Sequence, residues 1–230
     1  MPVSDDDPNT RLVRHLESWL GAWPPPSGKL VVVGSERREQ PGWDGRIQQV
    51  TGVATPEGAV LSVPTAAAPD VQALTNGDLE SLDWLGQRLG EVLGRPRARF
   101  GRGIFRWSAQ PADLRDAGEW VDRDDPRVPE WLHPFNSDVL VAWDDEGRYG
   151  SGVGRKQHDR FGHELAVATE PALQGRGIAR RLVAQAARQV LADGAVPTYL
   201  HDPSNIASAH VAEAAGFPDI GWHILGLWGA

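Results

Sequence analysis

A glycine-rich turn stands between two predicted elements, a strand over residues 163–169 and a helix over residues 178–193. The first turn of such a helix leaves four backbone N–H groups without partners, and the helix dipole adds partial positive charge there. Gly175 and Gly177 let the backbone approach a bulky group, because a Cβ atom would stand in the way. Three arginines add positive charge at this turn: Arg176, Arg180 and Arg181. The pattern favours binding of a phosphate or pyrophosphate, although an ordinary strand-to-helix turn with a solvated basic face has the same residues.

Two common nucleotide-binding motifs fit this turn poorly. The dinucleotide fingerprint G-x-G-x-x-G needs a third glycine where this chain has Arg180, and no strand–helix–strand unit leads into the turn. The phosphate-binding pattern G-x-x-x-x-G-K-[ST] does not occur in the sequence. Dinucleotide binding therefore stays only as a weak alternative.

At these residues the chain resembles the GNAT superfamily of N-acetyltransferases. The family's acetyl-CoA signature, [Q/R]-x-x-G-x-[G/A], is met by residues 174–179, Gln-Gly-Arg-Gly-Ile-Ala. The elements that follow in the family are matched by a strand over 196–202, a helix over 203–215 and then Gly216-Phe217. Asp202 followed by Pro203 suits the start of that helix.

The resemblance covers roughly residues 100–230 and implies an α/β fold. We expect a mixed twisted sheet of the GNAT acyl-CoA N-acyltransferase type, with helices on both faces and an N-terminal extension. The predicted domains are an N-terminal region over 1–105, either a diverged half-sized copy of the same fold or a cap, and an acetyltransferase core over 106–230.

The same resemblance implies an enzyme that moves the acetyl group of acetyl-CoA directly to a primary amine. The signature turn would hold the pyrophosphate, and the strand before it would pair its backbone with the pantetheine arm, with Leu165 to Val167 as the alternative register. The implied acetyl-CoA contacts are Val167, Ala168, Thr169, Gln174, Gly175, Arg176, Gly177, Ile178, Ala179, Arg180 and Asn205.

Proton transfer needs a base for the amine and an acid for the thiolate. A carboxylate on the signature strand serves as base in some relatives, which makes Glu164 and His163 the candidates here. Many relatives carry a tyrosine seven residues after the helix asparagine that gives a proton to the thiolate, but this chain has Ala212 there. Ser208 and His210 are possible substitutes. A non-catalytic acyl-CoA-binding sensor or structural module is therefore the alternative function.

Composition excludes several other classes. The chain of 230 residues has no cysteine, so it has no thiol nucleophile, disulfide or Cys-based metal site. A net charge of −8 argues against binding to nucleic acid or to an anionic membrane. The histidines lack the spacing of metal ligands. The first seven residues do not resemble a secretory signal. We therefore expect a cytoplasmic protein. The resemblance implies a monomer or homodimer that acts on a small-molecule or peptide amine.

Apolar patterns predict the remaining elements. Helices are expected over residues 11–20 and 70–93, the second broken near Asn76-Gly77; strands over 30–33, 47–53, 59–63, 99–107, 138–143 and 149–156; and short helices and loops over 111–134. The loop stretch 108–136 is rich in acidic residues and tryptophan, which would suit a cationic acceptor if it lines the site.

Overall fold

The computed structural model describes residues 7–229, except for the side chain of Gln87. The described residues divide into two compact units. Unit 1 comprises Arg106–Asp219 together with the described residues up to Leu12, and unit 2 comprises Val13–Phe105 together with 220–229. The predicted domains, 1–105 and 106–230, are continuous segments, whereas both units are assembled from two segments. The predicted boundary between residues 105 and 106 stays a prediction.

Unit 1 contains a five-stranded mixed sheet in the order β9-β8-β7-β6-β5. Adjacent strands pair antiparallel, except for the parallel pair of β8 and β9. The bounds are β5 Glu119–Val121, β6 Val139–Trp143, β7 Tyr149–Gln157, β8 Gly162–Thr169 and β9 Val196–His201.

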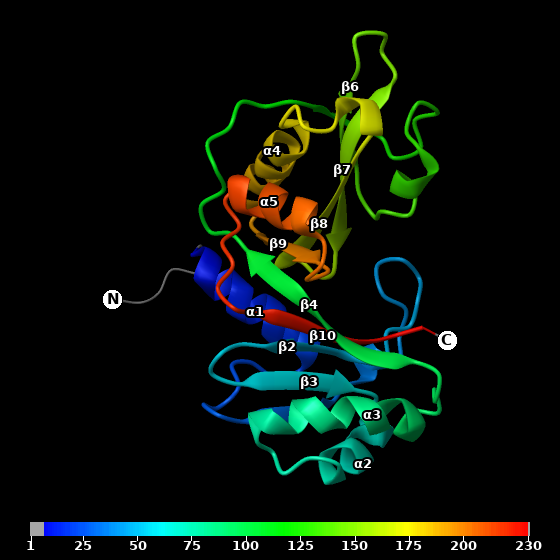
Figure 1. Cartoon of the computed structure of the whole chain (residues 1–230), viewed down its shortest axis with the longest axis vertical. Helices are drawn as coiled ribbons and strands as arrows, with labels where there is room; N and C mark the ends of the chain where they lie inside the picture. The colour runs from blue at the N-terminus through cyan, green and yellow to red at the C-terminus, as the bar shows by residue number, and fades with distance from the viewer. Residues whose placement is uncertain (1–6, 230) are drawn as a thin grey trace. The chain divides into compact units, whose positions relative to one another are not determined.

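Two helices pack beside this sheet, α4 (Ile178–Ala192) and α5 (Ile206–Ala214) (Figure 1). The apolar spacing of α4 places Leu182, Ala186 and Val190 on its buried face. These side chains join buried residues of β6 to β9 in one hydrophobic cluster. Removal of this apolar surface from water stabilises the unit.

Unit 2 contains strands in the order β1-β3-β2-β10-β4, with β1 and β3 parallel and the other pairs antiparallel. The strand bounds are β1 Leu30–Gly34, β2 Thr51–Ala54, β3 Ala59–Val63, β10 His223–Trp228 and β4 Arg99–Trp107, whose last two residues belong to unit 1. The helix bounds are α1 Pro8–Leu20, which begins in unit 1, α2 Ala68–Ala73 and α3 Leu82–Val92. Its own cluster of buried apolar residues includes Leu61, Leu85 and Leu225.

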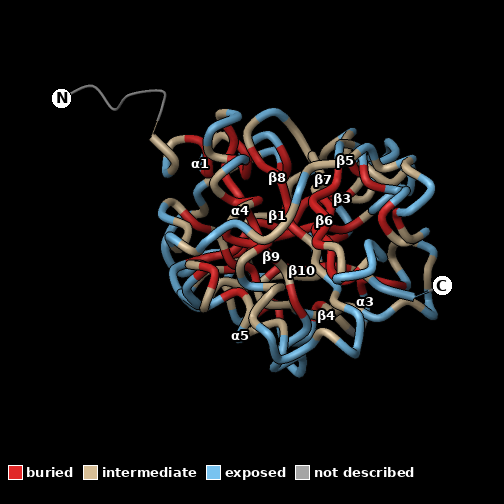
Figure 2. Tube along the Cα trace, turned by 90° about the horizontal axis from the view of Figure 1, so that it is seen from above, coloured by how far each residue is buried: buried red, intermediate tan, exposed pale blue. Residues whose placement is uncertain are grey.

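Short 3-10 helices complete the described structure: η1 Glu36–Arg38, η2 Thr65–Ala67, η3 Leu79–Ser81, η4 Glu130–Leu132 and η5 Pro171–Leu173. Buried residues make up most of β2, β3 and β6, whereas most residues of β4 and β5 are intermediate or exposed (Figure 2). The predicted α/β fold with a mixed sheet is confirmed, and neither group of strands closes into a barrel.

Most predicted elements are confirmed with small shifts of their ends. The helix predicted over 70–93 is broken as expected, into α2 and α3. One prediction was wrong, and one strand was missed. The final helix begins at Ile206 rather than at the Asp202-Pro203 pair, and β10 was not predicted at all. The loop stretch 111–134 contains β5 in addition to the expected turns.

No helix within residues 7–229 is long and apolar enough to cross a membrane. The segment on which the expectation about a secretory signal rests lies almost entirely outside the described residues.

Candidate active site

A cavity of about 710 Å³ opens in unit 1 between the end of β8, the start of α4, β9 and α5. Its volume lies in the range of small-molecule sites. The structure brings together every residue that the sequence predicted as an acetyl-CoA contact. The cavity is lined by Val167, Ala168, Thr169, Gln174, Gly175, Arg176, Gly177, Ile178, Ala179, Arg180 and Asn205, and in addition by Leu173, Tyr199, Ala207, Ser208, His210, Val211 and Ala214.

Strands β8 and β9 separate at the cavity. Their parallel pairing runs from Gly162 opposite Val196 to Leu165 opposite Tyr199 and then ends. Beyond that point, residues 166–169 of β8 are paired only with β7 in the described structure. Of these residues, Val167, Ala168 and Thr169 line the cavity, and the Thr169 carbonyl accepts from Gln174. An extended ligand can lie along this side of the strand in place of β9.

The signature turn is held in a conformation that requires glycine. Gly175 and Gly177 have φ of 75° and 72°, in the left-handed region that other residues rarely adopt. Gln174 fixes the turn to the end of β8, because its Nε2 donates to the Thr169 carbonyl at 3.1 Å. Gln174 thus has a structural partner in addition to its place at the cavity wall.

Gly177 is the N-cap of α4, and no side chain within the described residues caps this helix. The first amides of α4 are therefore available to an anion. Arg176 and Arg180 are exposed beside them and add positive charge. Arg181, grouped with them in the sequence, is not among the lining residues.

The opposite wall of the cavity comes from α5. Asn205 is the N-cap of this helix, and its Oδ1 accepts a hydrogen bond from the Ser208 backbone N–H at 3.0 Å. The side-chain oxygen is therefore used in capping, and the Nδ2 group is left to donate to a ligand. Asp202 instead accepts from the Ser204 N–H at 2.7 Å, in the turn before the helix.

Tyr199 is a cavity residue that the sequence analysis did not select. Its hydroxyl lies 2.8 Å from the Ser208 Oγ, and its ring is almost completely buried. Burial raises the pKa of Tyr199, while the hydrogen bond with Ser208 and the charge of Arg106 act in the opposite direction. No local sequence signal could have identified this contact, because the two residues lie on different elements.

Glu164 and His163 are the two predicted residues that the cavity leaves out. Both are buried at the other end of β8, where Glu164 forms an ion pair with Lys156 on β7. His158 Nε2 lies 3.0 Å from the other carboxylate oxygen. Burial alone would raise the pKa of Glu164, but Lys156 and His158 outweigh it and lower the pKa to about 2. A carboxylate held in this way is a weak base.

Arg106 connects β4 with the elements around α5 inside unit 1. The guanidinium is buried and donates to Glu213 Oε2 at 2.8 Å, to the Phe217 carbonyl at 2.9 Å and to His201 Nε2 at 3.2 Å. Because arginine can only donate, His201 Nε2 is the acceptor, and its Nδ1–H donates to the Asp202 carbonyl at 2.9 Å. The His201 ring is therefore held between Arg106 and the Asp202 carbonyl.

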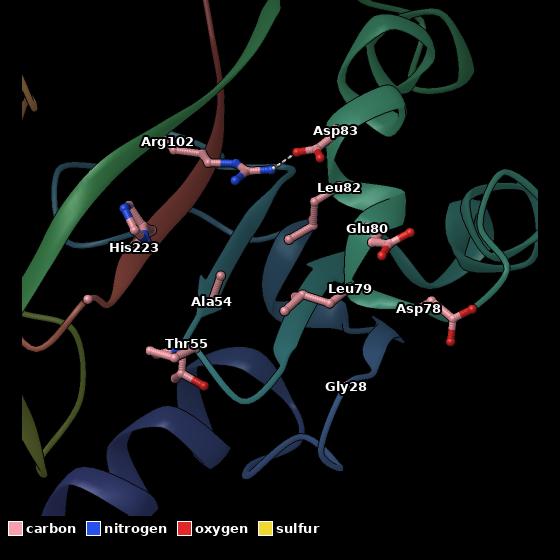
Figure 3. Close-up of a pocket in the computed structure, with 12 residues that line it drawn as sticks. Gly28, Ala54, Thr55, Asp78, Leu79, Glu80, Leu82, Asp83, Arg102 and His223 are labelled. Atoms are coloured by element: carbon pink, nitrogen blue, oxygen red, sulfur yellow. Dashed lines mark hydrogen bonds and ion pairs between the residues drawn. The ribbon is translucent and has the colours of Figure 1, made fainter.

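Unit 2 contains a separate pocket of about 610 Å³ (Figure 3). Its charged groups are exposed, and two of its carboxylates are paired: Asp83 with Arg102 at 2.7 Å and Asp78 with Lys29 at 2.8 Å. Figure 3 shows Asp83 directed toward Arg102 across the pocket. Across residues 7–229, no group of three or more histidine, aspartate or glutamate side chains could hold a metal ion.

Comparison with family models matches residues 104–217 to the acetyltransferase (GNAT) family. No curated protein sequence matches the chain. Among solved structures, the chain is similar to a GNAT-family protein from Novosphingobium aromaticivorans, with 22% identity, a TM-score of 0.47 and coverage of 57% of this chain and 66% of the other. It is similar to a GNAT-family acetyltransferase from Colwellia psychrerythraea, with 12% identity, a TM-score of 0.44 and coverage of 67% and 63%. The chain thus spans slightly less than two thirds of the length of these two proteins.

Proposed function

Residues 104–217 of this chain belong to the acetyltransferase (GNAT) family, and from this premise we propose that the protein transfers the acetyl group of acetyl-CoA directly to a primary amine. The observation that carries the proposal is the cavity of unit 1. There the start of α4, which no side chain caps in the described structure, lies beside the part of β8 that is no longer paired with β9. The acceptor is a small molecule or a peptide amine, and the proposed location is the cytoplasm.

The residues of the cavity fit the two parts of acetyl-CoA. The pyrophosphate would accept hydrogen bonds from the amides between Gly175 and Arg180, with the charges of Arg176 and Arg180 beside it. The pantetheine arm is extended and has amide groups, so it can pair with the backbone of residues 166–169. A backbone N–H in the same stretch would polarise the thioester carbonyl.

His210 is our candidate for removal of the amine proton. It lines the cavity on α5 and is exposed, whereas Glu164 is buried in an ion pair outside the cavity. Its imidazole nitrogen can accept the proton as the amine attacks the thioester carbon.

The first test is calorimetric titration with acetyl-CoA, with NAD as the control ligand. We expect micromolar binding of acetyl-CoA alone. A panel of amines is then screened for release of the free CoA thiol. Binding of NAD instead would overturn the proposal, and binding of acetyl-CoA without turnover on any amine would favour the non-catalytic module.

A glycine pair tests the proposed pyrophosphate site. Gly177→Val and Gly147→Val both place a side chain at a φ above +70°, so both carry similar backbone strain. Only Gly177 lines the cavity. We expect at least tenfold weaker acetyl-CoA binding for Gly177→Val and unchanged binding for Gly147→Val. Equal affinities of the two variants would contradict the assignment.

A further inference from the structure

The hydroxyl groups of Tyr199 and Ser208 meet at 2.8 Å in the wall of the unit 1 cavity. Tyr199 comes from β9 and Ser208 from the first turn of α5. The Tyr199 ring is 2% exposed and belongs to the buried cluster that includes Phe217 and Ala212. The ring therefore has little freedom to move, and its hydroxyl is fixed at the edge of the cavity.

Tyr199 also stands at the point where the strands part. It lies opposite Leu165 in the last pair between β8 and β9, and the backbone of residues 166–169 follows immediately. A thioester bound along that backbone would have its reacting end close to this point. The phenol is thus placed toward the reacting atoms of the proposed reaction.

Burial raises the pKa of Tyr199, so its hydroxyl holds its proton and is available as a donor. The hydrogen bond with Ser208 and the charge of Arg106 limit this rise and favour the phenolate once the proton has been given up. Arg106 is itself held in place by Glu213 and the Phe217 carbonyl. Ser208 can donate its own hydroxyl hydrogen to the phenolate oxygen.

The Thr169 hydroxyl and the His210 imidazole also line the cavity, but they are less suited to donate a proton to the CoA sulfur. The Thr169 Oγ1 lies 2.7 Å from the Ser151 Oγ, and an aliphatic hydroxyl is a far weaker acid than a phenol. His210 is our candidate for the proton of the amine, so a separate donor is needed for sulfur.

We propose that Tyr199 protonates the sulfur of CoA as it leaves, with Ser208 as the positioning residue that orients the phenol. This inference rests on the proposed acetyl transfer. When the tetrahedral adduct collapses, the C–S bond breaks and its electron pair goes to sulfur. The hydrogen of the Tyr199 hydroxyl passes to that sulfur, which gives the CoA thiol and a phenolate. The phenolate recovers a proton from solvent, and the proton lost by the amine balances the exchange.

The first experiment needs no acceptor amine. Calorimetry compares the affinities of CoA and desulfo-CoA for the wild type, Tyr199→Phe, Ser208→Ala and the control Ser204→Ala, whose hydroxyl lies in the turn before α5 and does not line the cavity. A hydrogen bond to sulfur should make the wild type prefer CoA by about fivefold. We expect Tyr199→Phe to lose this preference and Ser204→Ala to keep it.

The second experiment measures turnover as release of the CoA thiol from acetyl-CoA, with the best amine of the panel. Tyr199→Phe should lower kcat by at least tenfold with an unchanged Kd for acetyl-CoA. Ser208→Ala should lower kcat less, and Ser208→Thr, which restores a hydroxyl, should recover most of it. Thermal unfolding checks that each variant is folded.

The outcomes separate the two proposals. If the wild type binds neither CoA nor acetyl-CoA, the proposed function fails, and this inference with it. If the wild type binds and turns over acetyl-CoA but Tyr199→Phe retains both the CoA preference and the full kcat, the role of Tyr199 is overturned while acetyl transfer stands.

Discussion

The charge state of Glu164 is set by its neighbours and not by its place on the signature strand. The cross-strand pair with Lys156 and the contact with His158 keep the carboxylate ionised although it is buried. Removal of one member of a buried ion pair leaves the other without compensation. Glu164 is therefore expected to matter for stability more than for proton transfer.

Glu164→Gln should lower the free energy of unfolding by roughly 3 kcal/mol at pH 7. The pKa of Glu164 is lowered from 4.5 to about 2 in the folded protein, so its contribution is fully present above pH 4.5 and is lost as the pH falls toward 2. Urea unfolding at pH 7 and pH 3 measures this contribution. The difference in free energy of unfolding between the wild type and Glu164→Gln should be smaller at pH 3 than at pH 7.

Glu146→Gln is the matched control, because Glu146 forms an exposed ion pair with Arg148. Exposed pairs contribute at most about 1 kcal/mol. A destabilisation of the same size in both variants, or a gap for Glu164→Gln that does not depend on pH, would contradict the argument.

His210 offers a test of the proposed base. His210→Gln should lower kcat about a hundredfold, with the acetyl-CoA Kd unchanged. His223→Gln, which alters a histidine of the unit 2 pocket, should leave kcat unchanged. A kcat of wild-type size in His210→Gln would exclude His210 as the base.

Single residues were predictable where the signal is contiguous. The glycines and Gln174 of the signature turn are neighbours in sequence, so the motif locates them together. Tyr199 and the ion pair of Glu164 were not predicted, because both depend on partners from other elements. A sequence does not show that Ser208 will face Tyr199 or that Lys156 will stand opposite Glu164.

At the scale of elements, helix α5 depends on its cap. Asn205→Ala removes the acceptor for the Ser208 N–H and should lower the free energy of unfolding by about 1 kcal/mol. Asn205→Asp supplies an equivalent acceptor and should retain the stability. Urea unfolding of both variants tests this prediction. If both variants lose the same free energy of unfolding, the side-chain cap does not stabilise α5.

Strand and helix periodicity predicted the elements around the site, and in unit 2 the break near 76–77. The strand β10 was missed because Trp222, Ile224 and Leu225 give no regular alternation, and its strand state is imposed by β2 on one side and β4 on the other. The start of α5 was mistaken because Asp202 and Asn205 are both good cap residues, and only the three-dimensional turn selects between them.

At the scale of the whole molecule, each unit has its own buried cluster. Leu225→Ala should cost about 2–5 kcal/mol and lower the amide-exchange protection of β1 to β3. Leu182→Ala creates a similar cavity in the buried cluster of unit 1 and should instead lower the amide-exchange protection of β6 to β8. Loss of protection over all strands in both variants would show that the units unfold as one.

Because β10 pairs with both β2 and β4, these two strands are synthesised well before the strand that joins them. The ribosome makes β2 and β4 long before it makes residues 223–228, so the edges that later receive β10 remain unpaired while all of 106–219 is translated. Unpaired edges are where strands of other chains add. The strands of unit 2 that are translated first therefore gain their last partner at the end of synthesis. A nascent chain that stalls after residue 219 would present an open strand edge to its neighbours on a polysome.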